Sequence, residues 1–214
     1  SPDGKGWIED VHVYPKNESL LAEKLPGASS VNVGEELPWF VISSVPTDIK
    51  NFKKFNITDK MSEALDYVNG SVIVTALASK DAQTGTDLTE TEHWTSNLDT
   101  DTNTLSVIIN ADGRAALEGF KFVRISFKTI VNEKLLNLEN NSVTNSATIS
   151  TTDGLDQDSE INTPGSKAHA GSIRIDKIDA NSDAALEGAE FQIASSAENA
   201  ENAHFIRKTS EGKI

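Results

Sequence analysis

Residues 121–130, KFVRISFKTI, carry the clearest structural pattern in the chain. Val123, Ile125 and Phe127 fall on one face of an extended segment, and polar residues alternate with them on the other face. An alternation with a period of two is typical of an antiparallel β-strand that has one buried and one solvated face. This segment therefore predicts a strand that packs on the core of a sheet.

Further short strands are expected on both sides of this segment, separated by clusters of Asn, Asp, Gly and Pro. They span residues 39–45, 54–58, 71–77, 104–110 and 144–151. Two short helical patches, at 61–65 and 115–119, would be surface connections. Many short strands with turn signals between them predict an all-β fold of the sandwich type.

The composition narrows the classes of function. Hydrophobic residues make up 37% of the 214 residues and aromatic residues only 6%, which suits half-buried strands. The formal net charge of −14 disfavours binding to nucleic acid or to an anionic membrane surface. The chain has no cysteine, so disulfides, thiolate nucleophiles and cysteine metal sites are excluded. No apolar run reaches the length of about 18 residues that a membrane-spanning helix needs.

Shifts in composition divide the chain into four parts. Residues 1–17 predict an extended lead-in from a missing N-terminal domain, because the chain has neither an initiator Met nor a signal peptide. Residues 18–152 would form the sandwich, and residues 153–170, rich in Asp, Ser, Gly, Pro and Ala, a linker. Residues 171–214 would begin a second β domain, too short to hold a core of its own.

A motif stands at the start of the chain. Residues 7–17 read WIEDVHVYPKN, and they resemble the pilin motif of the major backbone pilins of Gram-positive bacteria, the SpaA-like shaft subunits assembled by sortases. In that family a class C sortase joins the motif lysine to the sorting signal of the next subunit. The resemblance implies that Lys16 is the acceptor of this intermolecular bond. A proline directly before a lysine also stiffens the backbone that would present the amine to an enzyme.

Residues 18–152 resemble the immunoglobulin-like middle domain of the same pilins, which is related to a collagen-binding adhesin. The matching segments are 33–35, 55–62 and 143–149. Such domains carry a spontaneous Lys–Asn isopeptide bond between their first and last strands, promoted by a buried acid. The resemblance implies that Lys24 is the lysine, Asp59 the acid and Asn145 the acceptor.

The proposed chemistry requires these three residue types. Burial favours a neutral amine on the lysine and a protonated carboxyl on the acid, and the acid can then polarise the asparagine amide for attack. Pro26, two residues after Lys24, is a residue that central strands avoid. Asn141 is the nearest alternative acceptor.

The segments 175–179 and 185–191 resemble the opening of a prealbumin-like β-sandwich of these pilins. The resemblance implies that Lys177 is a second bonding lysine, with its acid and its asparagine beyond residue 214.

Taken together, these resemblances imply a structural shaft subunit of a covalent pilus, extracellular and anchored to the cell wall. Its partners would be identical subunits in a head-to-tail fibre, a class C sortase, and minor tip and basal pilins. No cofactor is expected, and no metal, because the start of a calcium loop at Asp99, Asp101 and Asn103 lacks the later ligands. Two alternatives remain: an adhesin or pilus-tip module that binds host matrix proteins, and a carbohydrate hydrolase with two facing carboxylates. Apart from the pair of carboxylates that such a hydrolase would use, the sequence contains no motif of a turnover enzyme.

Overall fold

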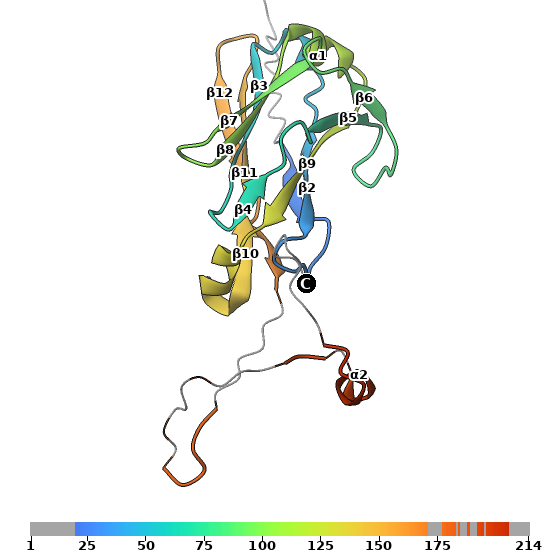
Figure 1. The fold of residues 1–214 in the computed structure, drawn as a ribbon. Helices are drawn as coiled ribbons and strands as arrows, with labels where there is room; N and C mark the ends of the chain where they lie inside the picture. Colours follow the sequence, from blue (N-terminus) through green and yellow to red (C-terminus); the bar gives the residue numbers. More distant parts are fainter. Residues whose placement is uncertain are drawn as a thin grey trace, which may run out of the picture.

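The chain is described by a computed structural model that covers residues 20–170, 177–182, 184, 188, 192–194 and 196–205. Residues 20–170 form two β-sheets packed face to face around one hydrophobic core (Figure 1). The prediction of an all-β sandwich is confirmed. The motif that contains Lys16 lies outside the described residues, so its role stays a prediction.

The strand β9 (Phe122–Val131) lies in the middle of the first sheet, where it pairs with β2, β4 and β5. The other strands of this sheet are β1 (Ala22–Pro26), β2 (Glu36–Ser44), β4 (Leu65–Tyr67), β5 (Ile73–Leu77) and β6 (Thr86–Leu88). Val123, Ile125 and Phe127 on β9 are at most 2% exposed. The face predicted from the alternating pattern is therefore the buried one.

The second sheet packs against the first and is also antiparallel. Its order is β12 (Asp158–Asn162), β11 (Ala147–Thr152), β3 (Lys54–Lys60), β8 (Thr104–Ile109) and β7 (Trp94–Asp99). Phe55, Ile57 and Asp59 alternate along β3 and point into the core, each at most 2% exposed. A carboxylic acid thus occupies a position that the strand period assigns to an apolar side chain.

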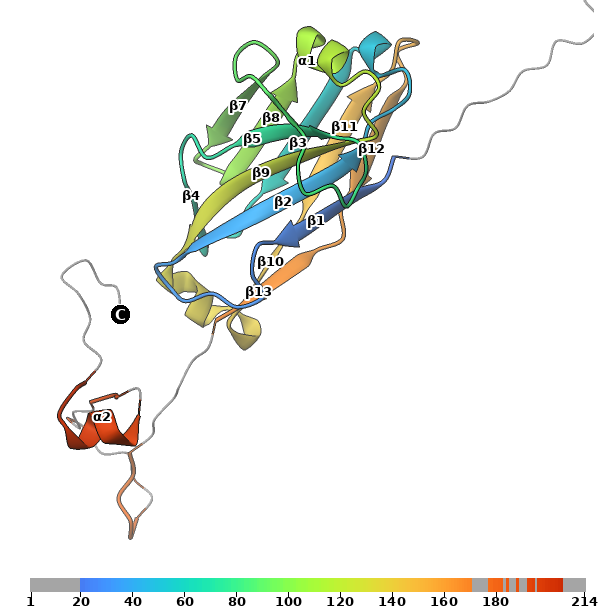
Figure 2. The same cartoon turned by 90° about the vertical axis from the view of Figure 1, so that its right-hand side faces the viewer.

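A third, two-stranded sheet joins β10 (Ser142–Asn145) to β13 (Ser166–His169). The backbone of β13 also contacts the segment that follows β1: the Val31 amide donates to the His169 carbonyl at 3.0 Å, and the His169 amide donates to the Ser29 carbonyl at 3.0 Å. Figure 2 shows β13 beside β1 and β10. The strand β13 therefore closes one side of the sandwich.

The prediction of a linker over residues 153–170 is wrong for residues 158–162 and 166–169, which form strands. The strand β12 pairs along β11, and β13 pairs along β10. Both strands lack an apolar alternation because β12 is an edge strand with exposed side chains, and Ala168 is the one residue of β13 that is fully buried. Polar cross-strand pairs hold β12 instead, such as Thr152 with Asp158 and Ser150 with Glu160.

The short connections also differ from the prediction. Residues 61–65 form a turn rather than a helix: the Leu65 amide donates to the Ser62 carbonyl, and Leu65 already begins β4. The helix α1 (Ala111–Ala116) begins earlier than expected because the Asn110 side chain caps it by accepting from the Gly113 amide. The remaining helices are η1 (Ile49–Asn51), η2 (Glu133–Asn137), η3 (Glu139–Asn141) and α2 (Ala197–Glu201).

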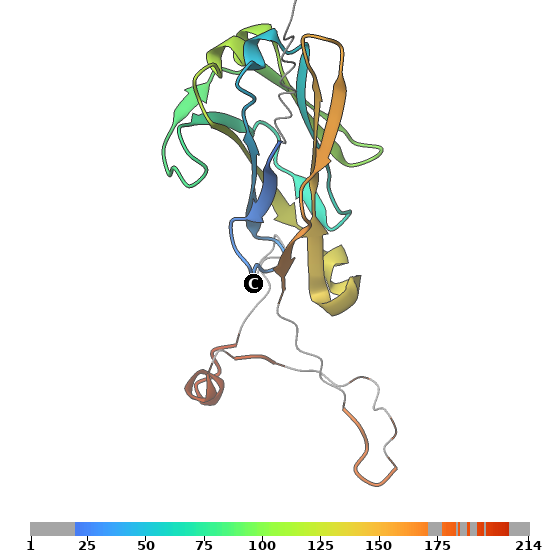
Figure 3. The same ribbon diagram turned by 180° about the vertical axis from the view of Figure 1, so that it is seen from behind.

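The described chain enters and leaves the sandwich toward opposite ends. Leu20 lies near the connection that follows α1, whereas the Ala170 amide donates to the Asn141 carbonyl beside η3 at the other end (Figures 1 and 3). Among the described residues after 176, none is buried, and Lys177 is exposed. The prealbumin-like domain and the bond of Lys177 therefore stay predictions. In the part of the chain that is described, the helices are too short or too polar to cross a membrane.

Candidate functional site: a buried lysine, acid and asparagine

Lys24 lies on β1, the edge strand of the first sheet, with its side chain turned into the core. The residue is 2% exposed, which is unusual for a lysine. The strand pairs on one side only, with β2, so Pro26 costs no hydrogen bond on the outer side. The edge position explains how a strand that contains a proline can carry the buried lysine.

Asp59 faces Lys24 from β3 of the opposite sheet. The Lys24 amine donates a hydrogen bond to Oδ2 of Asp59, and Asp59 is also 2% exposed. The strand register pairs Asp59 with Ala147, the first residue of β11, and only Ser146 separates Ala147 from the end of β10. The acid therefore lies where β10 and β11 meet.

Asn145 is the last residue of β10 and is 1% exposed. Its side chain adjoins the Asp59 carboxyl, although neither amide atom completes a hydrogen bond of normal geometry among the described residues. Oδ1 of Asp59 is likewise buried without a hydrogen-bond partner in the described part of the chain. Buried polar atoms of this kind are costly and call for an explanation.

The sequence-predicted trio is thus brought together in one buried cluster. The alternative acceptor, Asn141, lies at the end of η3 and is half-buried. The amide that adjoins Asp59 is that of Asn145.

The surroundings move the Lys24–Asp59 pair toward its neutral form. Burial lowers the pKa of Lys24 from 10.5 to about 8, and the Asp59 charge opposes this shift only in part. Burial raises the pKa of Asp59, while the Lys24 charge and the amide of Asn145 oppose the rise. A pKa of about 8 leaves about 10% of the amine neutral at pH 7, compared with about 0.03% for an unperturbed lysine.

Two aromatic rings, whose contact with Lys24 the sequence pattern does not predict, flank the amine. Lys24 Nζ lies 5.0 Å from the ring centroid of Trp39 and 5.1 Å from that of Phe127. Trp39 is fixed by its indole nitrogen, which donates to Thr129 Oγ1 at 3.1 Å. Burial in this surrounding is the main cause of the lowered pKa of Lys24. The alternating pattern alone placed Phe127 on the buried face, but it could not show which residue it would meet.

The other lysine–carboxylate pairs in the described part of the chain lie on the surface. In Lys50–Glu118 and Lys128–Glu36, both side chains of each pair are at least half exposed. Surface pairs of this kind contribute little to stability. Burial therefore distinguishes Lys24 from these lysines and makes it the candidate for chemistry.

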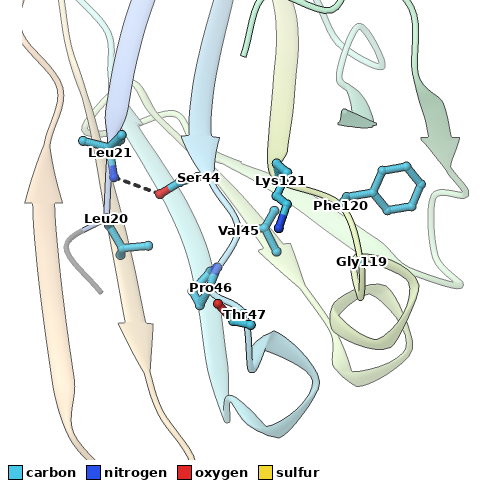
Figure 4. Close-up of a pocket in the computed structure, with 9 residues that line it drawn as sticks. All are labelled: Leu20, Leu21, Ser44, Val45, Pro46, Thr47, Gly119, Phe120 and Lys121. Atoms are coloured by element: carbon cyan, nitrogen blue, oxygen red, sulfur yellow. Dashed lines mark hydrogen bonds between the residues drawn. The ribbon is translucent and has the colours of Figure 1, made fainter. Parts of the chain in front are cut away.

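Two hollows on the surface offer no comparable cluster. One of about 270 Å³ lies at the start of the described chain, where Leu20 and Leu21 meet residues 44–47 and 119–121 (Figure 4). The Leu21 amide there donates to Ser44 Oγ at 2.9 Å. The other, of about 380 Å³, lies beside η3 and β13. Within the described residues no group of His, Asp and Glu is arranged to hold a metal ion, and Asp99 Oδ1 instead accepts hydrogen bonds from the amides of its own turn.

Comparison with known proteins extends these findings. No protein-family profile matches the chain. It is 29% identical over 210 residues to the fimbrial subunit type 2 of Actinomyces naeslundii, covering 87% of this chain and 37% of that protein. The major pilin GBS80 of Streptococcus agalactiae, solved as a 35 kDa C-terminal fragment, superimposes with a TM-score of 0.64 at 23% identity. That match covers 83% of this chain and 65% of the fragment. The chain has the fold of the Gram-positive major pilins.

A second solved structure gives the same result. BcpA, the major pilin subunit of Bacillus cereus, superimposes on this chain with a TM-score of 0.62 at 20% identity, over 92% of this chain and 50% of that one. The pilin resemblance drawn from the sequence is therefore confirmed for the fold. The chain spans less than two thirds of each of these relatives.

Proposed function

We propose that the chain is part of a shaft subunit of a covalent cell-surface pilus, stapled internally by an amide bond between Lys24 and Asn145. The observation that carries the proposal is the burial of a lysine, an acid and an asparagine in one cluster at the sheet edge. The similarity to fimbrial and major pilin subunits supports the structural role.

The bond would form by attack of the neutral Lys24 amine on the side-chain carbon of Asn145. Asp59, in the protonated form that its raised pKa favours, would donate from Oδ1 to the amide oxygen of Asn145 and make its carbon more electrophilic. The bond between Lys24 Nζ and Asn145 Cγ forms, and the bond between Cγ and Nδ2 breaks. The proton lost by the amine reaches the leaving nitrogen through Asp59, and one ammonia is released. No oxidant, metal or cofactor takes part.

Such a bond would take the place of the disulfides that the chain lacks. It would close a loop of 121 positions, from 24 to 145. By analogy with disulfides, this closure would stabilise the folded state by about 4 to 5 kcal/mol through the entropy of the unfolded chain.

Polymerisation would use a different lysine. Lys16 precedes Leu20 by four residues, so a load applied at Lys16 enters the sandwich through β1. We propose that a class C sortase joins Lys16 to the next identical subunit, with minor pilins at the tip and base, and that the fibre is anchored to the cell wall.

Intact mass spectrometry of the purified chain tests the internal bond. The wild type is expected to be lighter than its sequence mass by one ammonia, and Lys24→Ala, Asp59→Ala and Asn145→Ala should each have the full sequence mass. Lys128→Ala, which removes a surface ion pair, is the matched control and should lose the ammonia as the wild type does. Tandem mass spectrometry should recover one branched peptide that contains residues 24 and 145. A wild type with full sequence mass, or an Asn145→Ala variant that still loses ammonia, would refute the bond.

A further inference from the structure

The strands that carry the two reacting residues do not pair with each other. Among the described strands, β1 pairs with β2 alone and β10 with β13 alone. Lys24 and Asn145 therefore depend on something between the strands to fix their separation before any covalent bond exists. An attack of this kind needs the reacting atoms at about 3 to 3.5 Å and aligned.

Ser166, the first residue of β13, contacts both strands. The register of the small sheet places it directly opposite Asn145. Its hydroxyl donates a hydrogen bond to the backbone carbonyl of Lys24. Ser166 thus connects the backbone of Asn145 to the backbone of Lys24, which lies 142 positions earlier in the sequence.

The neighbours of Ser166 hold it in this place. A β-carbon on Gly165 would lie 2.8 Å from Thr144 Cγ2, so the chain passes close to β10 at this point. At the other end of β13, His169 forms backbone hydrogen bonds with Ser29 and Val31. One end of β13 thus lies against β10, and the other end lies against the segment that follows β1.

We infer that Ser166 is a positioning residue for the Lys24–Asn145 bond: its hydroxyl holds β1 at the separation from β10 that the reaction needs. The inference rests on the proposed function. Because the hydroxyl touches the lysine backbone and not the reacting atoms, its loss slows the reaction without abolishing it. One hydrogen bond of ordinary strength corresponds to a rate about three- to tenfold lower.

The rate of bond formation in the full chain tests this inference. The chain is made by cell-free synthesis at a temperature low enough to give a measurable wild-type half-time. Samples are quenched in denaturant, and the fraction that has lost one ammonia is followed by intact mass. Ser166→Ala and Ser166→Val should bond about three- to tenfold more slowly than the wild type, and Ser166→Thr, which keeps the hydroxyl and matches valine in shape, should bond at nearly the wild-type rate.

A control separates positioning from general stability. Ser150→Ala also removes a strand-to-strand hydroxyl contact, from Ser150 Oγ to Glu160 Oε1 at 3.0 Å, but away from the cluster. In the bond-free Asn145→Ala background, Ser166→Ala and Ser150→Ala should lower the melting temperature to a similar extent, whereas only Ser166→Ala should slow bonding in the bond-competent chain.

The possible results are distinct. If the wild type bonds and Ser166→Val is as fast as Ser166→Thr, or if Ser150→Ala slows the reaction as much as Ser166→Ala, the positioning role is wrong and the isopeptide proposal stands. If the wild type loses no ammonia at any time, both fail together.

Discussion

The amine of Lys24 and the carboxyl of Asp59 form an ion-pairing contact inside the sandwich, where each residue is 2% exposed. The two residues come from opposite sheets, so this contact links the sheets at the edge where β1 lies. Buried pairs are weak contributors to net stability, because desolvation offsets most of their attraction. Their presence here is better explained by reactivity than by stability.

Removing one partner of this pair should lower the free energy of unfolding. Asp59→Ala leaves the Lys24 amine buried without its acceptor, and it should be less stable than Asn145→Ala by about 3 to 5 kcal/mol. Both variants lack the covalent bond, so the comparison isolates the loss of the carboxyl. Chemical denaturation measures the difference, and equal free energies of unfolding would show that the pair has no energetic role.

The lowered pKa of Lys24 predicts a pH dependence of stability in the bond-free Asn145→Ala variant. Between about pH 8 and pH 10 the unfolded chain holds the Lys24 proton and the folded chain has released it. The unfolded state then binds more protons, so the free energy of unfolding rises with pH through this window. The rise should disappear in Lys24→Met/Asn145→Ala, which serves as the control. Denaturant titrations at several pH values would detect it, and parallel curves for the two variants would contradict the lowered pKa.

Single-molecule stretching should give a short extension for the bonded chain. A Lys24–Asn145 bond leaves residues 20–23 and 146–170 free to extend, which together span about 100 Å at about 3.5 Å per residue. Without the bond, all of residues 20–170 can extend, to about 530 Å. The wild type and Asn145→Ala should therefore differ about fivefold in contour length. A long extension in a wild type that has lost ammonia would place the bond elsewhere.

Polymerisation should depend on Lys16 and not on an exposed lysine of the sandwich such as Lys50. On cells that express the protein together with a class C sortase, the proposed polymerisation would give a ladder of covalent multimers on denaturing gels, and Lys16→Ala should abolish it. Lys50→Ala removes an exposed lysine of the described surface and should leave the ladder intact. Loss of the ladder in both variants would mean that the effect is not specific to Lys16.

The alternating pattern predicted the sandwich well because its central strands bury one face. Val123, Ile125 and Phe127 could be placed from their spacing alone. The edge strands β12 and β13 could not, because they are held by backbone pairing and by polar cross-strand contacts. The sequence likewise predicts one continuous strand over residues 144–151, whereas the structure breaks it at Ser146, between β10 and β11.

The site was predictable only through resemblance. Nothing in the spacing of Lys24, Asp59 and Asn145 shows that three distant residues meet, and burial of a lysine runs against its usual preference. Trp39 and Phe127 could be expected in the core, but their contact with an amine follows from the pairing of β1 with β2, which the pattern does not encode. Ser166 lies in the segment that the composition predicts to be a linker, and nothing in the sequence marks it as a residue of the site.

The order of the strands has a further consequence for the effect of proteolysis on the proposed fibre. A covalent bridge from β1 to the end of β10 would turn the 120 residues from 25 to 144 into a side loop off the path of tension. A protease cut in that loop, for example beside the exposed Lys80 between β5 and β6, would open the loop and leave the path unbroken. In the proposed fibre, most single cuts within this sandwich would then leave the subunits joined.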